Sequence, residues 1–446
     1  MNPEADRFLR QPHRTLAALA IPTVISLVAE PVAGIADTAF IARLGASPLA
    51  ALGVATTLLS GVIWVFNFLG IGTQTVVARA FGSGEPERAR TLLSTALWLA
   101  AGFGAALGAL AWPLLAGIAH WMGADGEVAA GSVEYLQIRL LGVPAVLLTF
   151  VAFGALRGLQ DMRTPLWISL AISALNVALD PLLIFGAGPV PAFGIAGAAW
   201  ATTATQWLGA AWALNSVTRR LGIDASFEGR QVRALFVVGR DMVIRTGSLL
   251  LFLILATRVA TEIGPESGAA HQGIRQIWML GAQLLDAFAY AAQSLIGYFL
   301  GAGAVATARR VAGVACGWAL ATGAALALLM LGLEAGVEFL LVPASALAAF
   351  GPAWWVAALC QPLNALSFAT DGIHFGTADY AYLRNAMIVA TGAGAILLAG
   401  IDRTGQDALS YVWLATALWI GIRSAAGVVR IWPGIGNAPL GSRALN

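Results

Sequence analysis

Long apolar stretches separated by short polar segments recur along the whole chain of 446 residues. Each stretch has enough residues for an α-helix to cross the roughly 30 Å of hydrocarbon in a bilayer. Twelve such stretches are found, at residues 15–42, 48–72, 92–119, 134–157, 164–187, 194–214, 237–261, 268–298, 310–333, 346–372, 383–400 and 409–430. This pattern predicts an all-α integral membrane protein with twelve transmembrane helices.

The polar segments between these stretches alternate in charge. Arginines precede the first stretch and follow every even-numbered one, as at Arg79 and Arg157, whereas acidic residues gather in the other loops, as at Asp125 and Asp402. Arginine-rich loops close to the ends of membrane helices usually stay on the cytoplasmic side. We therefore expect a multi-pass protein whose two termini are both cytoplasmic.

The two halves of the sequence resemble each other at a nearly constant spacing. Gln74 matches Gln293, 219 residues later, and several glycines and arginines around them match at the same spacing. The segment GALRGLQD at 154–161 matches GIHFGTAD at 372–379, with a spacing of 218 residues. An offset that stays constant over several loops is typical of an internal repeat.

Each copy of the repeat contains six apolar stretches, which is an even number. The two copies therefore have the same orientation and are related by an axis along the membrane normal, as in the parallel repeats of secondary transporters. This arrangement predicts two pseudo-symmetric six-helix lobes, at 1–214 and 237–446, joined by a cytoplasmic linker at 215–236.

Composition excludes several classes of function. Charged residues make up only 11% of the chain and hydrophobic residues 59%, whereas soluble proteins carry about 25% charged residues. All the basic residues are arginine, which excludes a lysine-dependent phosphate-binding loop and a Schiff base. No basic stripe with interleaved aromatic residues is found, so we expect no binding to nucleic acid.

Cysteine and histidine give no sign of a metal or redox centre. Cys316 and Cys360 both lie in apolar runs, where a free cysteine usually serves as a small buried hydrophobic residue. The four histidines lack the spacing of metal ligands. We therefore expect no cofactor apart from a coupling ion.

Four polar residues within the apolar stretches are the main candidates for a functional site. Asp37 lies in the first stretch, where a carboxylate costs about 3 kcal/mol near a helix centre on insertion scales. Asn176 and Asp180 share one face of the fifth stretch, and Thr202 lies in the sixth. All but Asn176 are expected in the outer half of the bilayer, so the set predicts an oxygen-rich cation site, suited to Na⁺, or a proton relay.

Prolines in the same stretches add backbone oxygens to this site. Pro181 cannot donate to the carbonyl of Val177, and Pro31 cannot donate to that of Leu27. Free carbonyls at membrane depth are tolerated where they line a cavity. Glu30 lies two helical turns before Asp37 on roughly the same face and could extend the relay.

Structural roles are the alternative for these residues. Asp37 or Asp180 could neutralise an arginine inside the membrane, the candidates being Arg245, Arg258 and Arg275. Taken alone, Thr202 is more often a packing or capping hydroxyl than a ligand. Buried ionisable residues in membranes are nevertheless functional by default, so the set as a whole favours a site.

The second half has its own acids, Asp286 and Asp371, in or beside the eighth and tenth stretches. They could line the cavity, but we expect them to pair with arginines, the candidates being Arg275 and Arg384.

Seven segments carry a resemblance to a known family. They are PVAGIADTAFIARLG, TQTVVARAFGSG, GLQDMRTP, LNVALDPLLIFG, GIAGAAWATTATQ, LLDAFAYAAQSLIG and DGIHFGTADYAYLRNAM. In this order they resemble the multidrug and toxic compound extrusion (MATE) family, in its DinF-type bacterial branch. The resemblance extends from about Thr15 to Arg430.

The resemblance implies two six-helix lobes around a central cleft and export of organic cations in exchange for H⁺ or Na⁺. The family's key acid in the first helix corresponds to Asp37. The asparagine, aspartate and threonine of its N-lobe cation site correspond to Asn176, Asp180 and Thr202. One departure is Gln293, where DinF-type relatives often carry a glutamate.

The resulting hypothesis is an ion-coupled antiporter, and not an enzyme, that exports amphipathic, often cationic small molecules by alternating access. The resemblance also implies the bacterial inner membrane as its location, with the lipid bilayer as its surroundings, and a single chain could work as a monomer. The alternative is a lipid-linked precursor flippase of the same superfamily, which usually has cationic residues in its cavity and more than twelve spans. A membrane enzyme should show acidic metal-binding motifs or histidines in surface loops, and the short arginine-rich loops lack them.

Overall fold

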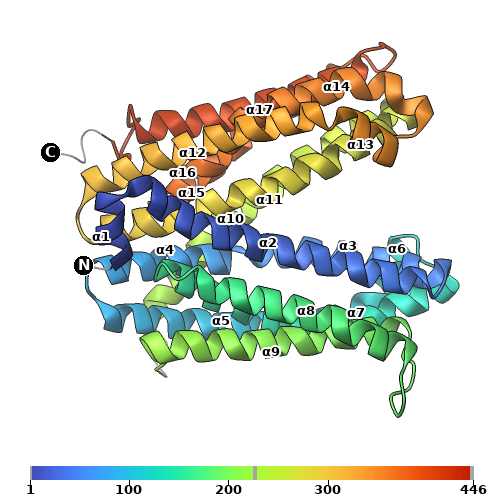
Figure 1. Ribbon diagram of the computed structural model, residues 1–446, viewed down its shortest axis with the longest axis horizontal. Helices are drawn as coiled ribbons and strands as arrows, with labels where there is room; N and C mark the ends of the chain where they lie inside the picture. Colours follow the sequence, from blue (N-terminus) through green and yellow to red (C-terminus); the bar gives the residue numbers. More distant parts are fainter. Residues whose placement is uncertain (1–2, 225–228, 442–446) are drawn as a thin grey trace. The chain divides into compact units, whose positions relative to one another are not determined.

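A computed structural model describes residues 3–224 and 229–441, and these ranges are mostly helical (Figure 1). The chain divides into two compact units. We call Ile21–Gly239 the N-unit, and we call the residues up to Ala20 together with those from Arg240 onward the C-unit. The two boundaries fall inside the helices α2 (Pro12–Ala42) and α10 (Gly229–Ile263).

The N-unit is built around one central helix, α7 (Gly126–Gly158), which packs against α3, α4, α5 and α9. Helix α8, which carries Asp180, packs against α9. Besides α7 and its part of α2, the unit contains α3 (Ala46–Phe66), α4 (Phe68–Gly82), α5 (Pro86–Ala111), η1 (Trp112–Leu114), α6 (Leu115–Trp121), α8 (Arg163–Phe185), α9 (Ile195–Leu221) and the start of α10.

In the C-unit, α15 (Gln361–Gly376) takes the central place and packs against α11, α12 and α17. Its apolar core includes Phe252 stacked on Trp419, with ring centroids 4.5 Å apart. The other helices are α1 (Pro3–Arg10), α11 (Pro265–Gly301), α12 (Val305–Gly332), α13 (Glu334–Leu341), η2 (Ala344–Ala346), α14 (Leu347–Leu359), α16 (Tyr380–Ala399), α17 (Ala408–Ile431) and most of α10.

Glycines let the central helix of each unit approach its neighbour closely, and they do so at matching positions of the repeat. A Cβ atom on Gly154 would lie 2.3 Å from the carbonyl oxygen of Gly70 on α4. A Cβ atom on Gly372 would lie 2.4 Å from the carbonyl oxygen of Ala289 on α11. Because no larger residue fits at these distances, the GxxxG spacing in both halves is explained by backbone-to-backbone packing.

The next glycine of each motif makes the same contact one turn later. A Cβ atom on Gly158 would lie 2.8 Å from the carbonyl oxygen of Gln74, and one on Gly376 would lie 2.8 Å from that of Gln293. The side chains of both glutamines are fully buried. The pair Gln74 and Gln293, which the sequence aligned, therefore has the same surroundings in the two units.

The two central helices also end with the same backbone conformation. The residue before Asp161 and the residue before Asp379 both have positive φ, 64° and 56°, which ends the helix in a left-handed turn. Asp161 then pairs with Arg220 at 2.7 Å, and Asp379 pairs with Arg430 at 2.7 Å. This ion pair links the end of the central helix to the end of α9 in the N-unit and to the end of α17 in the C-unit.

The predicted count of twelve spans is not confirmed. Of the helices among the described residues, nine are long and apolar enough to cross a membrane, and α14 with α15, bent by 44°, would make a tenth. The other two predicted spans, 194–214 and 268–298, correspond to α9 and α11. Both helices are long enough to span but carry more polar side chains, such as Arg275 and Asp286 on α11.

Helices occupy both ends of the range predicted as a linker, 215–236. Helix α9 continues to Leu221 and α10 begins at Gly229. Residues 225–228 of that range lie outside the described residues. The lobe boundaries given above from the sequence stay a prediction.

The close packing of the central helices can be tested with glycine variants. Gly372→Ala should lower stability by about 1–3 kcal/mol, because the new methyl group overlaps the α11 backbone. The control is Gly313→Ala on α12, where no atom lies within 4 Å of the added carbon. Thermal unfolding of the purified variants in detergent measures the difference, and equal unfolding temperatures would contradict the packing argument.

Candidate functional site

Polar side chains of α2, α8 and α9 gather inside the N-unit, and we call this group the polar layer. It includes the carboxyl groups of Asp37 and Asp180. Asp37 on α2 is 9% exposed and Asp180 on α8 is fully buried, and the two side chains interact directly. Among the described residues, no donor reaches Oδ1 of Asp37 or either carboxyl oxygen of Asp180. Buried carboxylate oxygens need a compensating partner, and two adjacent carboxylates repel each other. The pair is therefore suited to taking up positive charge.

The other two predicted residues also meet. Asn176 Nδ2 donates to the hydroxyl of Thr202 at 3.2 Å, which joins α8 to α9. The Thr202 hydroxyl donates in turn to the carbonyl oxygen of Ala198 at 2.9 Å. Because Asn176 lies one helical turn before Asp180, the amide and the carboxyl group lie on the same face of α8. The four residues predicted from the sequence therefore form two contacts, one between the two aspartates and one between the asparagine and the threonine. Both contacts involve α8.

Close helix packing positions these groups. A Cβ atom on Gly197 of α9 would lie 2.4 Å from the carbonyl oxygen of Leu183, so α8 and α9 approach each other with no side chain between them. Helix α2 is joined to α8 by a hydrogen bond of 2.8 Å between the hydroxyls of Ser26 and Ser169. These contacts join α2, α8 and α9, the three helices that carry the four predicted site residues.

Both prolines stay within continuous helices. Pro181 lies inside α8 and Pro31 inside α2. Since proline has no N–H group, the carbonyls of Val177 and Leu27 lack their helical donors. Backbone oxygens of this kind add to an oxygen-rich environment, which suits a proton or a hard cation such as Na⁺.

Arg139 of α7 also belongs to this layer, although it is not among the residues predicted from the sequence. Its side chain is only 8% exposed, and its Nη1 donates to Gln206 Oε1 at 2.7 Å and to Thr203 Oγ1 at 3.5 Å. Tyr135, one turn earlier on α7, interacts with Arg139 and feels the charges of both aspartates. Arg139 lies five residues into its predicted span, a position from which arginine side chains commonly extend to the membrane surface, so its place in the sequence gives no signal of burial.

Glu30 has a different environment from the aspartate pair. Its side chain is exposed, although it feels the charge of Arg139. The structure therefore does not bury Glu30 together with Asp37.

In the C-unit, Asp371 is neutralised by two arginines. Its Oδ2 accepts hydrogen bonds from Arg423 Nη2, at 2.9 Å, and from Arg245 Nη2. All three side chains are buried. The guanidinium of Arg423 also lies 4.5 Å from the ring centre of Trp419, and that of Arg245 lies 5.1 Å from the ring centre of Phe375. Asp371 thus has the structural pairing that was expected, in a buried network.

The partners of Asp371 differ from those expected. Arg384 pairs instead with Asp241 at 2.6 Å, and Arg275 donates to Gln272 at 3.3 Å. The reason is helix orientation, since the arginines that face Asp371 come from α10 and α17. Asp286 is partly buried on α11, and its charge acts on Arg423.

The arginines considered as partners for the N-unit aspartates have other partners. Arg245 binds Asp371, Arg258 pairs with Glu262 at 2.7 Å, and Arg275 contacts Gln272. Across the described ranges, no group of three or more histidine, cysteine or acidic side chains is arranged to hold a metal ion. The Asp37–Asp180 pair with Asn176 and Thr202 is accordingly the candidate for ion binding.

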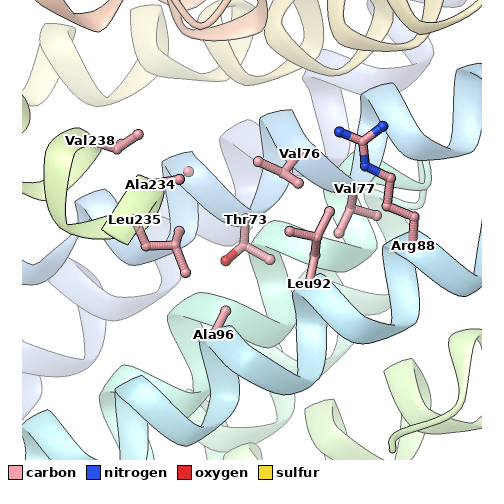
Figure 2. A pocket seen from close by; sticks show the side chains of 10 residues that line it. Thr73, Val76, Val77, Arg88, Leu92, Ala96, Ala234, Leu235 and Val238 are labelled. Carbon is pink, nitrogen blue, oxygen red and sulfur yellow. The ribbon is translucent and has the colours of Figure 1, made fainter. Parts of the chain in front are cut away.

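A separate cavity of about 250 Å³ lies in the N-unit between α4, α5 and the start of α10 (Figure 2). Its lining is mostly aliphatic, with Thr73 and Arg88 as the polar members. None of the polar-layer residues lines it. An aliphatic lining of this kind suits a hydrocarbon group.

The structural role of Asp371 can be tested by removing its charge. Asp371→Asn leaves two buried guanidinium groups without their shared carboxylate, so we expect a loss of about 3–5 kcal/mol of stability. Asp407→Asn makes the same chemical change at an exposed position and should have little effect. Thermal unfolding in detergent compares the two, and a stable Asp371→Asn protein would show that the network is not required for folding.

Comparison with known proteins agrees with this arrangement. The model of the family MatE matches residues 22–182, a range that contains Asp37, Asn176 and Asp180. Protein DETOXIFICATION 44, chloroplastic, from Arabidopsis thaliana is 31% identical over 433 residues, which covers 93% of this chain and 81% of the plant protein. DNA damage-inducible protein F from Escherichia coli K12 is 27% identical over 436 residues, covering 95% of this chain and 93% of that protein.

A solved structure shares the fold over nearly the whole chain. A MATE protein crystallised in the bent conformation matches with a TM-score of 0.86 and 22% identity, over 96% of this chain and 97% of that one. This match confirms the all-helical fold that the sequence predicted. With the family model and the relatives, it shows that the chain belongs to the multidrug and toxic compound extrusion (MATE) family, whose members are membrane-embedded secondary transporters and not enzymes.

Proposed function

We propose that this transporter is an ion-coupled antiporter that exports amphipathic, often cationic compounds in exchange for H⁺ or Na⁺. The observation that carries the proposal is the buried Asp37–Asp180 pair, in which Oδ1 of Asp37 and both carboxyl oxygens of Asp180 have no hydrogen-bond donor among the described residues. Asn176 and Thr202 supply further oxygen atoms beside it. A site with this composition suits small cations and protons.

Exchange follows if the ion and the substrate use the same negative charge. When a proton or Na⁺ occupies the pair, its charge is neutralised, and a cationic substrate loses its electrostatic attraction to the site. A ligand that binds one conformation more tightly shifts the population toward that conformation. Alternating access then couples uptake of the ion to release of the substrate. The name of the plant relative, DETOXIFICATION 44, is consistent with export of harmful compounds.

A lipid-linked precursor flippase is the second candidate, because the chain has buried arginines that a phosphate group would require. Arg245 and Arg423, however, are paired with Asp371, and Arg139 is held by Gln206. These cations are already hydrogen-bonded, whereas three of the four carboxyl oxygens of the aspartate pair have no donor among the described residues. The balance favours the cation exporter.

Transport in proteoliposomes tests the proposed function. A fluorescent lipophilic cation is the substrate, and pH and Na⁺ gradients are imposed separately. Asp37→Asn and Asp180→Asn should each reduce gradient-driven transport by at least about tenfold, which corresponds to a loss of roughly 1.4 kcal/mol of ion binding. Each removes a charge that the coupling ion needs.

The control for this experiment is Asp125→Asn, which makes the same change at an exposed carboxylate beside His120. It should transport at the wild-type rate. Full ion-driven transport by a folded Asp37→Asn protein would remove Asp37 from the coupling mechanism. Transport of a lipid-linked phosphate, with none of the cation, would favour the flippase.

We also propose that the protein works as a monomer in the bacterial inner membrane, with both termini cytoplasmic. The arginine-rich even-numbered loops support this orientation. Because Cys316 and Cys360 are buried, a cysteine introduced at an exposed loop can be labelled selectively.

In intact cells a membrane-impermeant maleimide should react with Asp125→Cys and spare Ser83→Cys, which lies in an arginine-rich loop. After the membrane is opened, both should react. The reverse pattern in intact cells would invert the topology.

A further inference from the structure

The separate cavity in the N-unit has a charged group at one end and aliphatic groups along its length. Arg88, Leu92 and Ala96 of α5 line it at intervals of four residues, so they share one face of the helix. At about 1.5 Å of rise per residue, this face extends for roughly 12 Å. Figure 2 shows Arg88 at one end of the lining and Leu235 and Val238 of α10 at the other. The cavity is therefore long enough to hold part of a hydrocarbon chain.

The lining between these ends offers little to a polar ligand. Val76, Val77 and Leu92 are aliphatic, and the hydroxyl of Thr73 already donates to the carbonyl oxygen of Leu69 at 2.7 Å. Burial of hydrocarbon in such a space is favourable in proportion to the apolar area that is removed from water. A molecule that fits the whole cavity therefore has a hydrocarbon chain with an ionic group at one end.

The charge at the end of the cavity favours an anion. The side chain of Arg88 is 66% exposed, and its Nη1 donates to Oε2 of Glu85, whose side chain is 48% exposed, at 3.0 Å. Ion pairs this exposed contribute little to stability, so a phosphate can compete for the guanidinium and its five N–H donors. Arg88 also lies in the first turn of α5, where the helix dipole favours negative charge. A cationic compound would be repelled from the same place.

The position of Arg88 along the chain points to a phospholipid. It lies in the arginine-rich loop between the second and third predicted spans, which the orientation proposed above places on the cytoplasmic side. The cytoplasmic leaflet carries anionic phospholipids, and basic pockets between membrane helices on that side bind their head groups. The phosphate of such a lipid would lie at the level of the Arg88 loop, with its acyl chains in the hydrocarbon of the bilayer.

We propose that the cavity between α4, α5 and the start of α10 binds one acyl chain of an anionic phospholipid, whose phosphate binds Arg88. This site lies beyond the proposed function, since none of the residues assigned to the coupling ion lines it. Only its assignment to the cytoplasmic leaflet rests on the orientation proposed above.

A bound chain would also contact the segment by which the polypeptide leaves the N-unit. Leu235 and Val238 line the cavity just before the boundary at Gly239. They already lie beside α4, because a Cβ atom on Gly72 would be 3.8 Å from Leu235 Cδ2 and 3.6 Å from Val238 Cγ1. Filling the cavity adds apolar contacts among α4, α5 and α10, so the bound lipid should stabilise the folded protein.

The test uses the purified full-length chain in detergent after its lipids have been removed. Dioleoyl phosphatidylglycerol is added back, the retained lipid is counted by native mass spectrometry, and thermal unfolding is followed in parallel. Dioleoyl phosphatidylcholine has the same chains with no net charge, oleate has a chain with a carboxylate, and glycerol phosphate has no chain. We expect phosphatidylglycerol to be retained and to raise the unfolding temperature more than any of the other three.

Two variants should change the binding of phosphatidylglycerol in opposite directions. Arg88→Gln removes the cation and should weaken binding about fivefold, as expected for one arginine near an anionic lipid head group. Glu85→Gln removes the competing carboxylate, 3.0 Å from Arg88 Nη1, and should strengthen binding. The matched control is Arg219→Gln, at an exposed arginine of α9 outside the cavity lining, which should leave binding unchanged.

A third variant tests the hydrocarbon part of the site. Ala96→Leu places a larger side chain inside the cavity and should weaken the binding of phosphatidylglycerol at least about tenfold, because fewer methylene groups can be buried. The control is Ala105→Leu, at an exposed position of the same helix that does not line the cavity. If Ala96→Leu fails to fold, Ala234→Leu fills the cavity from an exposed position on α10.

Equal retention of phosphatidylglycerol and phosphatidylcholine would overturn the proposal, as would unchanged lipid binding by a folded Ala96→Leu or Ala234→Leu protein. Stronger retention of oleate would overturn the choice of a phospholipid in favour of a fatty acid. None of these measurements requires transport. If Asp37→Asn and Asp180→Asn transport normally, the proposed function fails and the lipid site stands, whereas failure of the lipid site leaves the antiporter proposal intact.

Discussion

The cost of burying charge away from water shapes the polar interior of this transporter. A carboxylate in a low-dielectric environment must be paired, protonated or bound to a cation. The two units meet this requirement in different ways. Asp37 and Asp180 of the N-unit lie against each other, and three of their four carboxyl oxygens have no donor among the described residues. Asp371 of the C-unit is instead bound by two guanidinium groups. The positive partners of Asp371 belong to the chain itself. In the function proposed above, the positive partner of the aspartate pair is an exchangeable ion.

The two units differ in this way although their central helices pack against neighbouring helices through matching glycines. Gly154 lets α7 approach α4, and Gly372 lets α15 approach α11 to a similar distance. Asp161 and Asp379, which follow these central helices, each form an ion pair with an arginine of another helix. The repeat therefore preserves the contacts that hold the helices together and leaves the polar interior free to diverge. Two units with matching helix contacts therefore differ in how they balance their buried carboxylates.

The sequence alone predicted the long helices from hydrophobic runs, the repeat from a fixed offset, and the four candidate residues from polar side chains within apolar stretches. All of these signals can be read along the chain without knowing how the helices pack. It overestimated the number of clearly apolar spans, since α9 and α11 place polar side chains within helices long enough to cross a membrane. Only the tertiary structure decided the partners: Arg139 with Gln206, and Asp371 with Arg245 and Arg423. Those pairings depend on how each helix is rotated toward its neighbours, and no pattern within a single stretch specifies that rotation.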